Sequence, residues 1–269
     1  LAPAQPYLQR IYAVKSREEL ARLFAAPGFA SPIAGFVDVD SKDTESYIFY
    51  FNTAGIGLPD RDNYLVDSPK NIEMRAKYKE MLTFLLGKAG YQDAAGAAEA
   101  VYDLEYQIAH AYWDRALGRN RDLTYNKVSR DEMLSLAGGF PLALMMDEVG
   151  IASQQQFVVR QLPPTAEEIA AAGYTPEQAA KLGAGVPGII RLANEAPLAT
   201  WQAWMAARFL AGNSDVLPKD IDDATFSFYG TYISGQPVQR ERWKRGVSTV
   251  EGMVGEAVGK VYAERHFPA

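Results

Sequence analysis

The C-terminal segment from Phe228 to Phe267 constrains the fold more than any other part of the chain. Gly235 and Pro237 interrupt it, and from about Arg240 onward apolar residues recur every three or four positions, the spacing of one helix face. This stripe consists of Trp243, Val247, Val250, Val254, Val258 and Val261. We therefore predict one long amphipathic helix over about residues 240–264.

Three glycines on the other side of this helix lead to a second prediction. Gly252, Gly255 and Gly259 fall nearly opposite the valine stripe, because each residue turns a helix by about 100°. An interior glycine costs roughly 1 kcal/mol relative to alanine, so we expect it where a neighbouring element leaves no room for a Cβ atom. The pattern predicts a core helix that is buried on both its valine side and its glycine side.

The composition is that of a folded globular protein. The chain has 269 residues, 48% of them hydrophobic, which is enough for a sizeable core in one large or two small domains. Its net charge of -6, with both signs interspersed, offers neither a basic field for nucleic acid nor a polybasic membrane anchor. We therefore expect neither of these partners.

Targeting signals and cysteines add little. No apolar run approaches the roughly 20 residues that span a bilayer, so we predict no transmembrane segment. The N-terminus has neither an initiator Met nor a signal-peptide core, and we expect it to lie within a longer protein or to follow processing. The absence of cysteine excludes disulfides and cysteine-ligated metals but leaves the compartment open.

Helix signals dominate the chain. Predicted helices cover about residues 16–27, 68–88, 94–116, 197–212 and 219–234, with short helices starting at Ser129, Thr165 and Thr175. The helices over 68–88 and 94–116 should pack as an antiparallel pair, since their connection is short. Period-two patterning over residues 36–51 predicts one β-hairpin, and residues 155–161 could form a short strand. The fold class is mainly α: a multi-helix domain with one β-hairpin.

Two polar loops contain further motifs. One is formed by Gly57, Leu58, Pro59, Asp60, Arg61, Asp62 and Tyr64, and the other by Arg121, Asp122, Tyr125 and Asn126. The glycines and the proline of the first force an irregular loop, which we expect to fold around its own ion pairs. Local hydrogen bonds explain its charges, so a structural role is favoured over a catalytic one.

These two loops and the C-terminal segment, in this order, resemble the non-catalytic domain of the neprilysin-like zinc metalloendopeptidases. The C-terminal motif residues are Arg242, Trp243, Lys244, Arg245, Gly255, Glu256 and Gly259, within Arg-Trp-Lys-Arg and Gly-Glu-Ala-Val-Gly-Lys-Val-Tyr. The resemblance implies that residues 1–269 form a single helical cap domain. In that family the cap encloses a chamber with a zinc domain and restricts substrates to peptides.

The resemblance also implies features outside this chain. The catalytic zinc domain of the same polypeptide would be the partner, zinc would be its cofactor, and peptides would be the substrates. Bacterial members are typically exported, which implies a periplasmic or secreted location, and the missing cysteines of animal members imply a bacterial source. Residues 162–186 have no counterpart in the family pattern and are expected to form an inserted, exposed helical hairpin.

The residues for zinc catalysis are missing from the sequence. A thermolysin-type site needs His-Glu-x-x-His on a helix and a third ligand from a later helix. The two histidines, His110 and His266, are far apart in the sequence, and His110, alone on its predicted helix, is interpreted as a packing or hydrogen-bonded residue. Glu99 and Asp103 match the spacing of the family's third ligand and its neighbouring aspartate, but without the histidine pair the match is a coincidence. We therefore assign no catalytic and no metal-binding residue.

Two further functions stay open. One is a stand-alone helical binding or scaffold module with no peptidase activity. The other is a self-contained enzyme, which is disfavoured because no cluster of titratable residues has a sensible spacing. Coding sequence beyond Ala269 with His-Glu-x-x-His would favour the cap domain, whereas a stop codon would favour the module.

Overall fold

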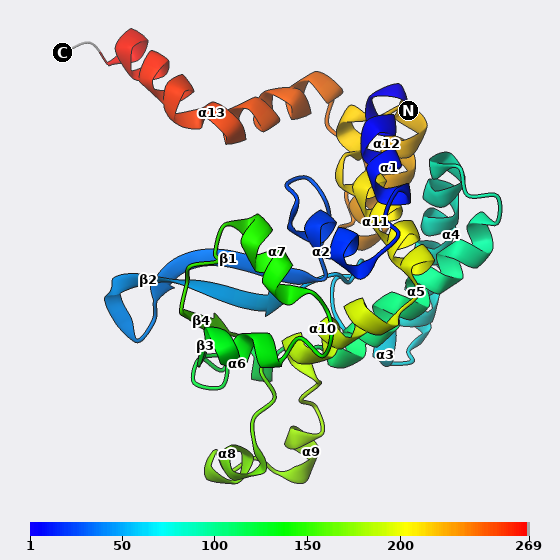
Figure 1. The fold of residues 1–269 in the computed structure, drawn as a ribbon. Coiled ribbons are helices and arrows are strands. Elements are labelled where there is room, and N and C mark those ends of the chain that lie inside the picture. The colour runs from blue at the N-terminus through cyan, green and yellow to red at the C-terminus, as the bar shows by residue number, and fades with distance from the viewer. Residues whose placement is uncertain (268–269) are drawn as a thin grey trace. The chain divides into compact units, whose positions relative to one another are not determined.

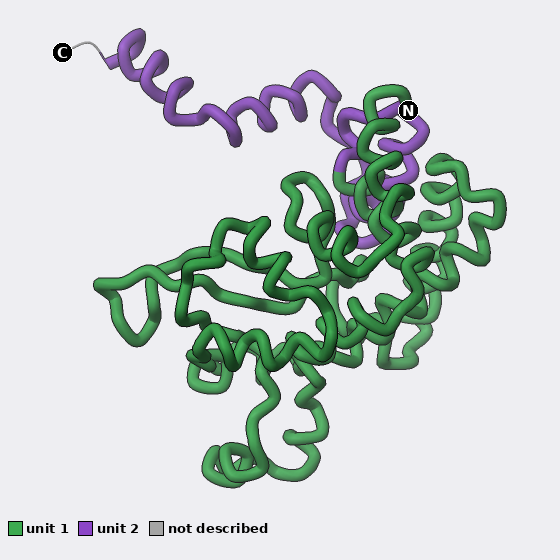
Figure 2. The backbone as a smooth tube through the Cα atoms, in the orientation of Figure 1, with its two compact units in different colours: residues 1–212 green, residues 213–269 purple. Residues whose placement is uncertain are grey.

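A computed structural model of the chain describes residues 1–267. It is mainly helical, as predicted, and divides into two compact units, Leu1–Gly212 and Asn213–Ala269 (Figure 2). The α-helices of the first unit are α1 (Gln5–Tyr12), α2 (Arg17–Ala25), α3 (Asp62–Leu65), α4 (Pro69–Ala89), α5 (Ala94–Ala111), α6 (Arg130–Ser135), α7 (Leu142–Val149), α8 (Ala166–Ala171), α9 (Pro176–Ala179), α10 (Gly185–Glu195) and α11 (Leu198–Gly212). Short 3-10 turns cover Ala2–Ala4 and Leu117–Arg119.

The pair of long helices α4 and α5 forms where the sequence predicted it. Ser68 caps α4 by accepting a hydrogen bond from the Asn71 N–H, Pro69 occupies its first turn, and Gly90 ends it at φ 97°. Helix α5 ends at Ala111, earlier than predicted, because Tyr112 is extended. Helix α11 packs against both, with the indole rings of Trp201 and Trp204 fully buried.

The first unit also contains a four-stranded sheet in the order β1-β2-β4-β3. The predicted hairpin is confirmed as β1 (Ile33–Asp40) and β2 (Asp43–Thr53), and the possible short strand as β4 (Gln156–Val159), which runs parallel to β2. Strand β3 (Asn126–Ser129) was not predicted, since its first residue belongs to a polar loop. It forms because β4 offers an antiparallel partner.

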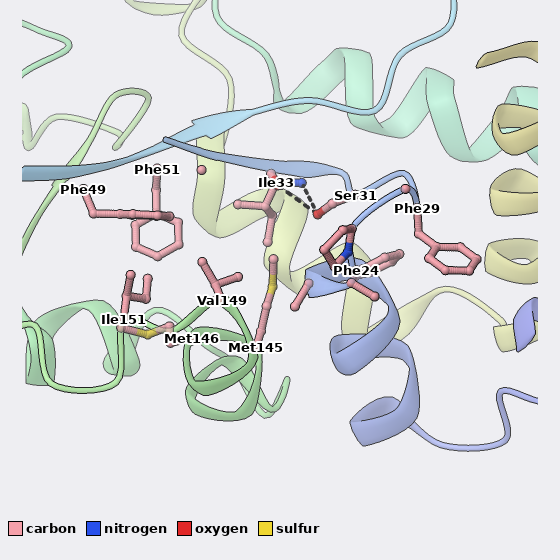
Figure 3. Close-up of a pocket in the computed structure, with 15 residues that line it drawn as sticks. Phe24, Phe29, Ser31, Ile33, Phe49, Phe51, Met145, Met146, Val149 and Ile151 are labelled. Atoms are coloured by element: carbon pink, nitrogen blue, oxygen red, sulfur yellow. Dashed lines mark hydrogen bonds between the residues drawn. The ribbon is translucent and has the colours of Figure 1, made fainter. Parts of the chain in front are cut away.

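The two faces of the sheet have different neighbours. Helices α2 and α7 pack together beside one face, from which Ile33, Phe49 and Phe51 project (Figures 1 and 3). On the other face Ile48, Tyr50 and Val158 form a small cluster against Tyr125. The strand order makes β1 one edge strand of the sheet and β3 the other.

Residues 162–186 leave the compact part of the first unit and return to it (Figure 1). They carry α8 and α9, whose capping boxes Thr165/Glu168 and Thr175/Gln178 are both present. Neither helix has a buried residue, which fits the exposed helical hairpin expected from the composition.

The second unit contains α12 (Lys219–Thr225), which continues directly into a π-helix (Phe226–Ile233), and α13 (Arg242–His266). The sequence predicted one helix over 219–234, and the structure changes its winding halfway. A 3-10 turn at Ser214–Val216 precedes α12.

The predicted burial of the C-terminal helix is wrong. Helix α13 exists with nearly the predicted bounds, but none of its residues is buried and the valines of the stripe are 44–53% exposed. Nothing lies within 4 Å of a Cβ atom built on Gly252, Gly255 or Gly259. Periodicity shows which faces are suited to packing, but among residues 213–267 no element covers them. The helix also kinks at Val254 (φ -131°, ψ 28°), which interrupts the stripe.

Candidate functional site

A buried glutamate organises the part of the first unit that carries the first motif. Helix α5 places Glu105 in the interior with 0% exposure. Its carboxylate accepts four hydrogen bonds: from Tyr64 Oη at 2.6 Å, Tyr78 Oη at 2.8 Å, Gly57 N–H at 3.1 Å and Trp204 Nε1–H at 3.0 Å. Burial raises the pKa of Glu105, although the charge of Arg208 and the first three of these donors act in the opposite direction.

The loop from Gly57 to Tyr64 is folded onto this carboxylate. The Tyr64 hydroxyl donates to Glu105 and accepts from the N–H groups of Gly57 and Leu58, each at 2.9 Å. A Cβ atom at residue 57 would lie 1.8 Å from the Tyr78 hydroxyl oxygen, so the close approach requires glycine. Gly57 and Tyr64, the first and last residues of the motif, are therefore both bonded to Glu105, which lies 41 positions after Tyr64 in the chain.

The charged residues of this loop are tied mainly to atoms outside it. Arg61 donates to the carbonyl oxygens of Tyr112 at 2.6 Å and Lys181 at 3.0 Å. Its ion pair with Asp62 is longer, at 3.7 Å. The expected ion pair within the loop is present, but the shorter contacts hold the loop to the end of α5 and to the segment after α9.

A cationic pocket lies beside the loop. It has a volume of about 310 Å³, and its lining includes Arg61, Arg115, Arg119, Pro59 and Asp60. Asp60 Oδ2 and Arg115 Nη1 are 4.0 Å apart at its rim, and the Arg115 side chain is 71% exposed. The lining contains no serine, cysteine, lysine or histidine. Three guanidinium groups in one lining are suited to binding a small anion such as a carboxylate.

The second motif is organised around Asp40, at the end of β1. Asp40 accepts from Tyr125 Oη at 2.7 Å, from the Lys42 N–H at 2.9 Å and from Lys127 Nζ at 3.0 Å. Burial alone would raise the pKa of Asp40, but these three donors outweigh it and lower the pKa to about 2.

Its other members also make local contacts. Asn126 donates to the carbonyl oxygens of Leu123 and Val159, at 2.8 and 2.9 Å, and Asp122 pairs with Lys42 at 3.2 Å. The Arg121 side chain is exposed. The second motif thus ties the hairpin tip to β3, at a different place from the Glu105 cluster.

The third motif belongs to the second unit. Arg245 makes a two-pronged contact with the Asp222 carboxylate at 3.0 and 2.6 Å, and Arg242 donates to the Leu217 carbonyl oxygen at 3.2 Å. Lys244 pairs with Glu241 at 3.0 Å. These contacts fasten the start of α13 to the region of α12 within the second unit.

The remaining residues of the third motif are exposed. Lys244 Nζ lies 5.3 Å from the centre of the Trp243 ring, and that side chain is 66% exposed. Gly255, Glu256 and Gly259 lie on the exposed part of α13.

The residues present do not fit a catalytic zinc ion. Within residues 1–267 no group of three or more His, Asp or Glu side chains could hold a metal. The His110 ring lies 4.8 Å from that of Tyr106, the His266 ring 4.6 Å from that of Tyr262, and Glu99 pairs with Lys79 at 2.5 Å. A zinc site needs three converging protein ligands, which these residues do not supply.

The helices in the described range are also too short or too polar to cross a membrane.

Sequence analysis missed the residues at the centre of the first cluster. Glu105 lies on the same helix face as Val101 and Ile108, both fully buried. A lone acidic residue within such a stripe is a recognisable signal, because a buried carboxylate needs several donors. Its donors Tyr78 and Trp204 come from α4 and α11, and no local pattern connects them to the loop.

Comparison of this fold with solved structures shows the class of protein. The zinc metalloprotease Zmp1 of Mycobacterium tuberculosis, in its open state, superposes with a TM-score of 0.81 at 28% identity, over 99% of this chain and 39% of that protein. PepO from Lactobacillus rhamnosis has the same fold, with a TM-score of 0.70 at 17% identity. This fold is that of one part of a zinc metalloprotease.

The family follows from the sequence. The N-terminal model of peptidase family M13 matches residues 1–269, and the chain belongs to this family. Endothelin-converting enzyme 1 of Bos taurus is 25% identical over 239 residues, covering 86% of this chain and 29% of the enzyme. Neutral endopeptidase of Lactobacillus helveticus is 22% identical, covering 98% of this chain and 38% of that protein. The chain thus spans roughly a third of the length of these relatives.

Proposed function

We propose that this chain is the non-catalytic cap domain of a longer, bacterial zinc metalloendopeptidase. In this proposal residues 1–269 enclose a chamber with a zinc domain of the same polypeptide and restrict its substrates to peptides. The observation that carries the proposal is coverage: 99% of this chain corresponds to only 39% of the Mycobacterium tuberculosis zinc metalloprotease. The described residues include no ligand set for zinc, so the metal and the catalytic residues are assigned to the downstream part.

The contacts of the motif residues support a structural role for them. Tyr64, Tyr125 and Arg245 each bind a buried carboxylate of this chain and hold one part of its fold together. We propose that the motifs maintain the shape of the cap and leave substrate contact to other residues. Residues 162–186 are proposed to be an insertion relative to the family, and a periplasmic or secreted location is proposed from the relatives.

Zinc content and peptide hydrolysis of two purified proteins test the function. The 269-residue chain alone should hold no stoichiometric zinc after dialysis and should not cleave a fluorogenic peptide. The same chain extended by its downstream coding sequence should do both, and a chelator should abolish the cleavage. Chelator-sensitive hydrolysis by residues 1–269 alone would contradict the proposal. An extension without a zinc motif would favour a stand-alone helical binding or scaffold module.

A further inference from the structure

Strand β1 leaves one edge of the sheet open. It pairs with β2 alone among the strands of residues 1–267, and residues 35–39 along it are exposed. The exposed fraction of the Val37 side chain is 63%. An exposed edge of this kind presents backbone N–H and C=O groups that can pair with a further strand.

A hydrogen bond just before the first residue of β1 shows which of its backbone groups face outward. The Ala54 N–H donates to the Pro32 carbonyl oxygen at 2.9 Å, so residues 32 and 54 form a hydrogen-bonded pair. Such pairs alternate along an antiparallel ladder, so residues 34, 36 and 38 direct their backbone groups at β2 and residues 33, 35, 37 and 39 direct theirs away from it.

The outer two of these four positions are capped within the chain. The Ile33 N–H donates to Ser31 Oγ at 3.2 Å, and Ser31 Oγ donates back to the Ile33 carbonyl oxygen at 2.8 Å. The Val39 N–H donates to Asp38 Oδ1 at 2.8 Å, and its carbonyl oxygen accepts from Tyr50 Oη at 3.0 Å. No such cap occurs among the described residues for Gly35 and Val37. The open edge is therefore limited to two residues.

An apolar pocket of about 320 Å³ lies against the sheet face from which Ile33 and Phe51 project (Figure 3), and its lining includes Gly35 of the open edge. Its inner walls are buried side chains from α2, the hairpin, α7 and the segment just after α7: Phe24, Ile33, Phe51, Met145, Met146 and Ile151. Gly35 and Val149 are exposed members of its lining. None of the lining residues is charged, so the pocket favours a neutral, apolar group.

We propose that β1 binds an extended peptide that pairs with Gly35 and Val37 and places one apolar side chain in this pocket. A residue opposite Gly35 projects to the same sheet face as Ile33 and Phe51, which line the pocket. Backbone pairing supplies affinity and the pocket selects a side chain, as in other cases of strand addition. The site uses residues of the first unit alone and does not depend on the proposed cap function.

A peptide suits this edge better than a second copy of the chain does. Two β1 strands pairing about Phe36 would place the partner's Val37 opposite Gly35. A valine side chain fills little of a pocket of about 320 Å³, whereas the side chain of Phe, Leu or Met fills it more completely.

Fluorescence anisotropy with a defined probe tests the proposal. The probe is a fluorescein-labelled, C-amidated pentapeptide, Thr-Val-Phe-Val-Thr, titrated with the 269-residue chain, and the matched probe has alanine in place of phenylalanine. We expect saturable binding of the first and at least about tenfold weaker binding of the second. Equal affinity for both probes, or no saturable binding of the first, would overturn the proposal.

Two pairs of variants separate the edge from the pocket. Val37→Pro removes one outward N–H from an exposed edge position, where proline is tolerated, whereas Val37→Thr keeps that N–H. Val149→Asp puts a charge beside the pocket, whereas Ala143→Asp puts it on an exposed part of α7 outside the lining. We expect Val37→Pro and Val149→Asp to weaken binding about tenfold or more and their partners to retain it.

Melting temperature and molar mass complete the test. All four variants should melt close to the unaltered chain, since the changes are at exposed positions. Unchanged affinity in both Val37→Pro and Val149→Asp would overturn the proposal. Sedimentation that shows a dimer, dissolved by Val37→Pro and unaffected by the probe, would assign the edge to a second copy instead.

Discussion

Replacing Glu105 with alanine tests whether the buried carboxylate holds the Gly57–Tyr64 loop on α5. Two of its four donors have another acceptor, because Trp204 Nε1 also reaches the Gly55 carbonyl oxygen at 3.2 Å and the Gly57 N–H also reaches Tyr64 Oη at 2.9 Å. The two shortest bonds to the carboxylate, from the hydroxyl groups of Tyr64 and Tyr78, are therefore expected to account for most of the cost.

The expected cost can be worked out from these two bonds. A hydrogen bond to a charged acceptor contributes about 1.5–3 kcal/mol, so the two bonds represent about 3–6 kcal/mol. Removing the carboxylate also relieves its desolvation, which offsets part of the sum. We expect Glu105→Ala to lower the free energy of unfolding by about 3 kcal/mol and Tm by roughly 6–12 °C.

Urea unfolding followed by circular dichroism measures this change. The control is Glu99→Ala on the same helix, where a 57% exposed carboxylate pairs with Lys79 and the expected cost is below about 1 kcal/mol. Tyr64→Phe completes a double-mutant cycle with Glu105→Ala. The double variant should lose less stability than the sum of the two single variants, since both changes remove the same Tyr64–Glu105 hydrogen bond. Additive costs, or a Glu105→Ala effect no larger than the control, would refute the reasoning.

Three further predictions concern Asp40, Gly57 and Gly259. The pKa of Asp40, about 2 when folded and about 3.9 when unfolded, means that its ionised form stabilises the fold above about pH 4 and that this contribution is lost as the pH falls toward 2. Asp40→Asn should therefore cost about 1–2 kcal/mol in urea unfolding at pH 7, allowing for solvent at Lys127, and progressively less in acid. Gly57→Ala should lower the free energy of unfolding by roughly 2 kcal/mol or more, and Tm by several degrees, because its Cβ atom would lie 1.8 Å from the Tyr78 hydroxyl oxygen. An unchanged Tm would contradict the inference that this position requires glycine. Gly259→Ala should stabilise helix α13 by about 1 kcal/mol, and so raise the helical circular dichroism signal of the isolated chain, because the added Cβ atom meets no neighbour. A loss of helical signal would show that another element covers this face.

The sequence alone determined the elements whose signals are local. Ser68 and Pro69 start α4 and Gly90 ends it, and Ser129 and Glu132 form the predicted capping box of α6. These signals could be recognised because each involves residues only a few positions apart in the sequence. The alternation over residues 36–51 likewise predicted the hairpin, whose strands are adjacent in the chain. The resemblance of the three motifs led to the correct family.

Only the tertiary structure decided the partners of the motif residues. Tyr64 reaches Glu105 41 positions away, and Tyr125 reaches Asp40 85 positions away, so neither pair leaves a periodic trace in the sequence. Strand β3 exists because β4 offers a hydrogen-bonding edge. Helix α13 shows the same limit from the opposite side: its pattern specifies two faces suited to burial, but burial needs a second surface, which periodicity cannot supply.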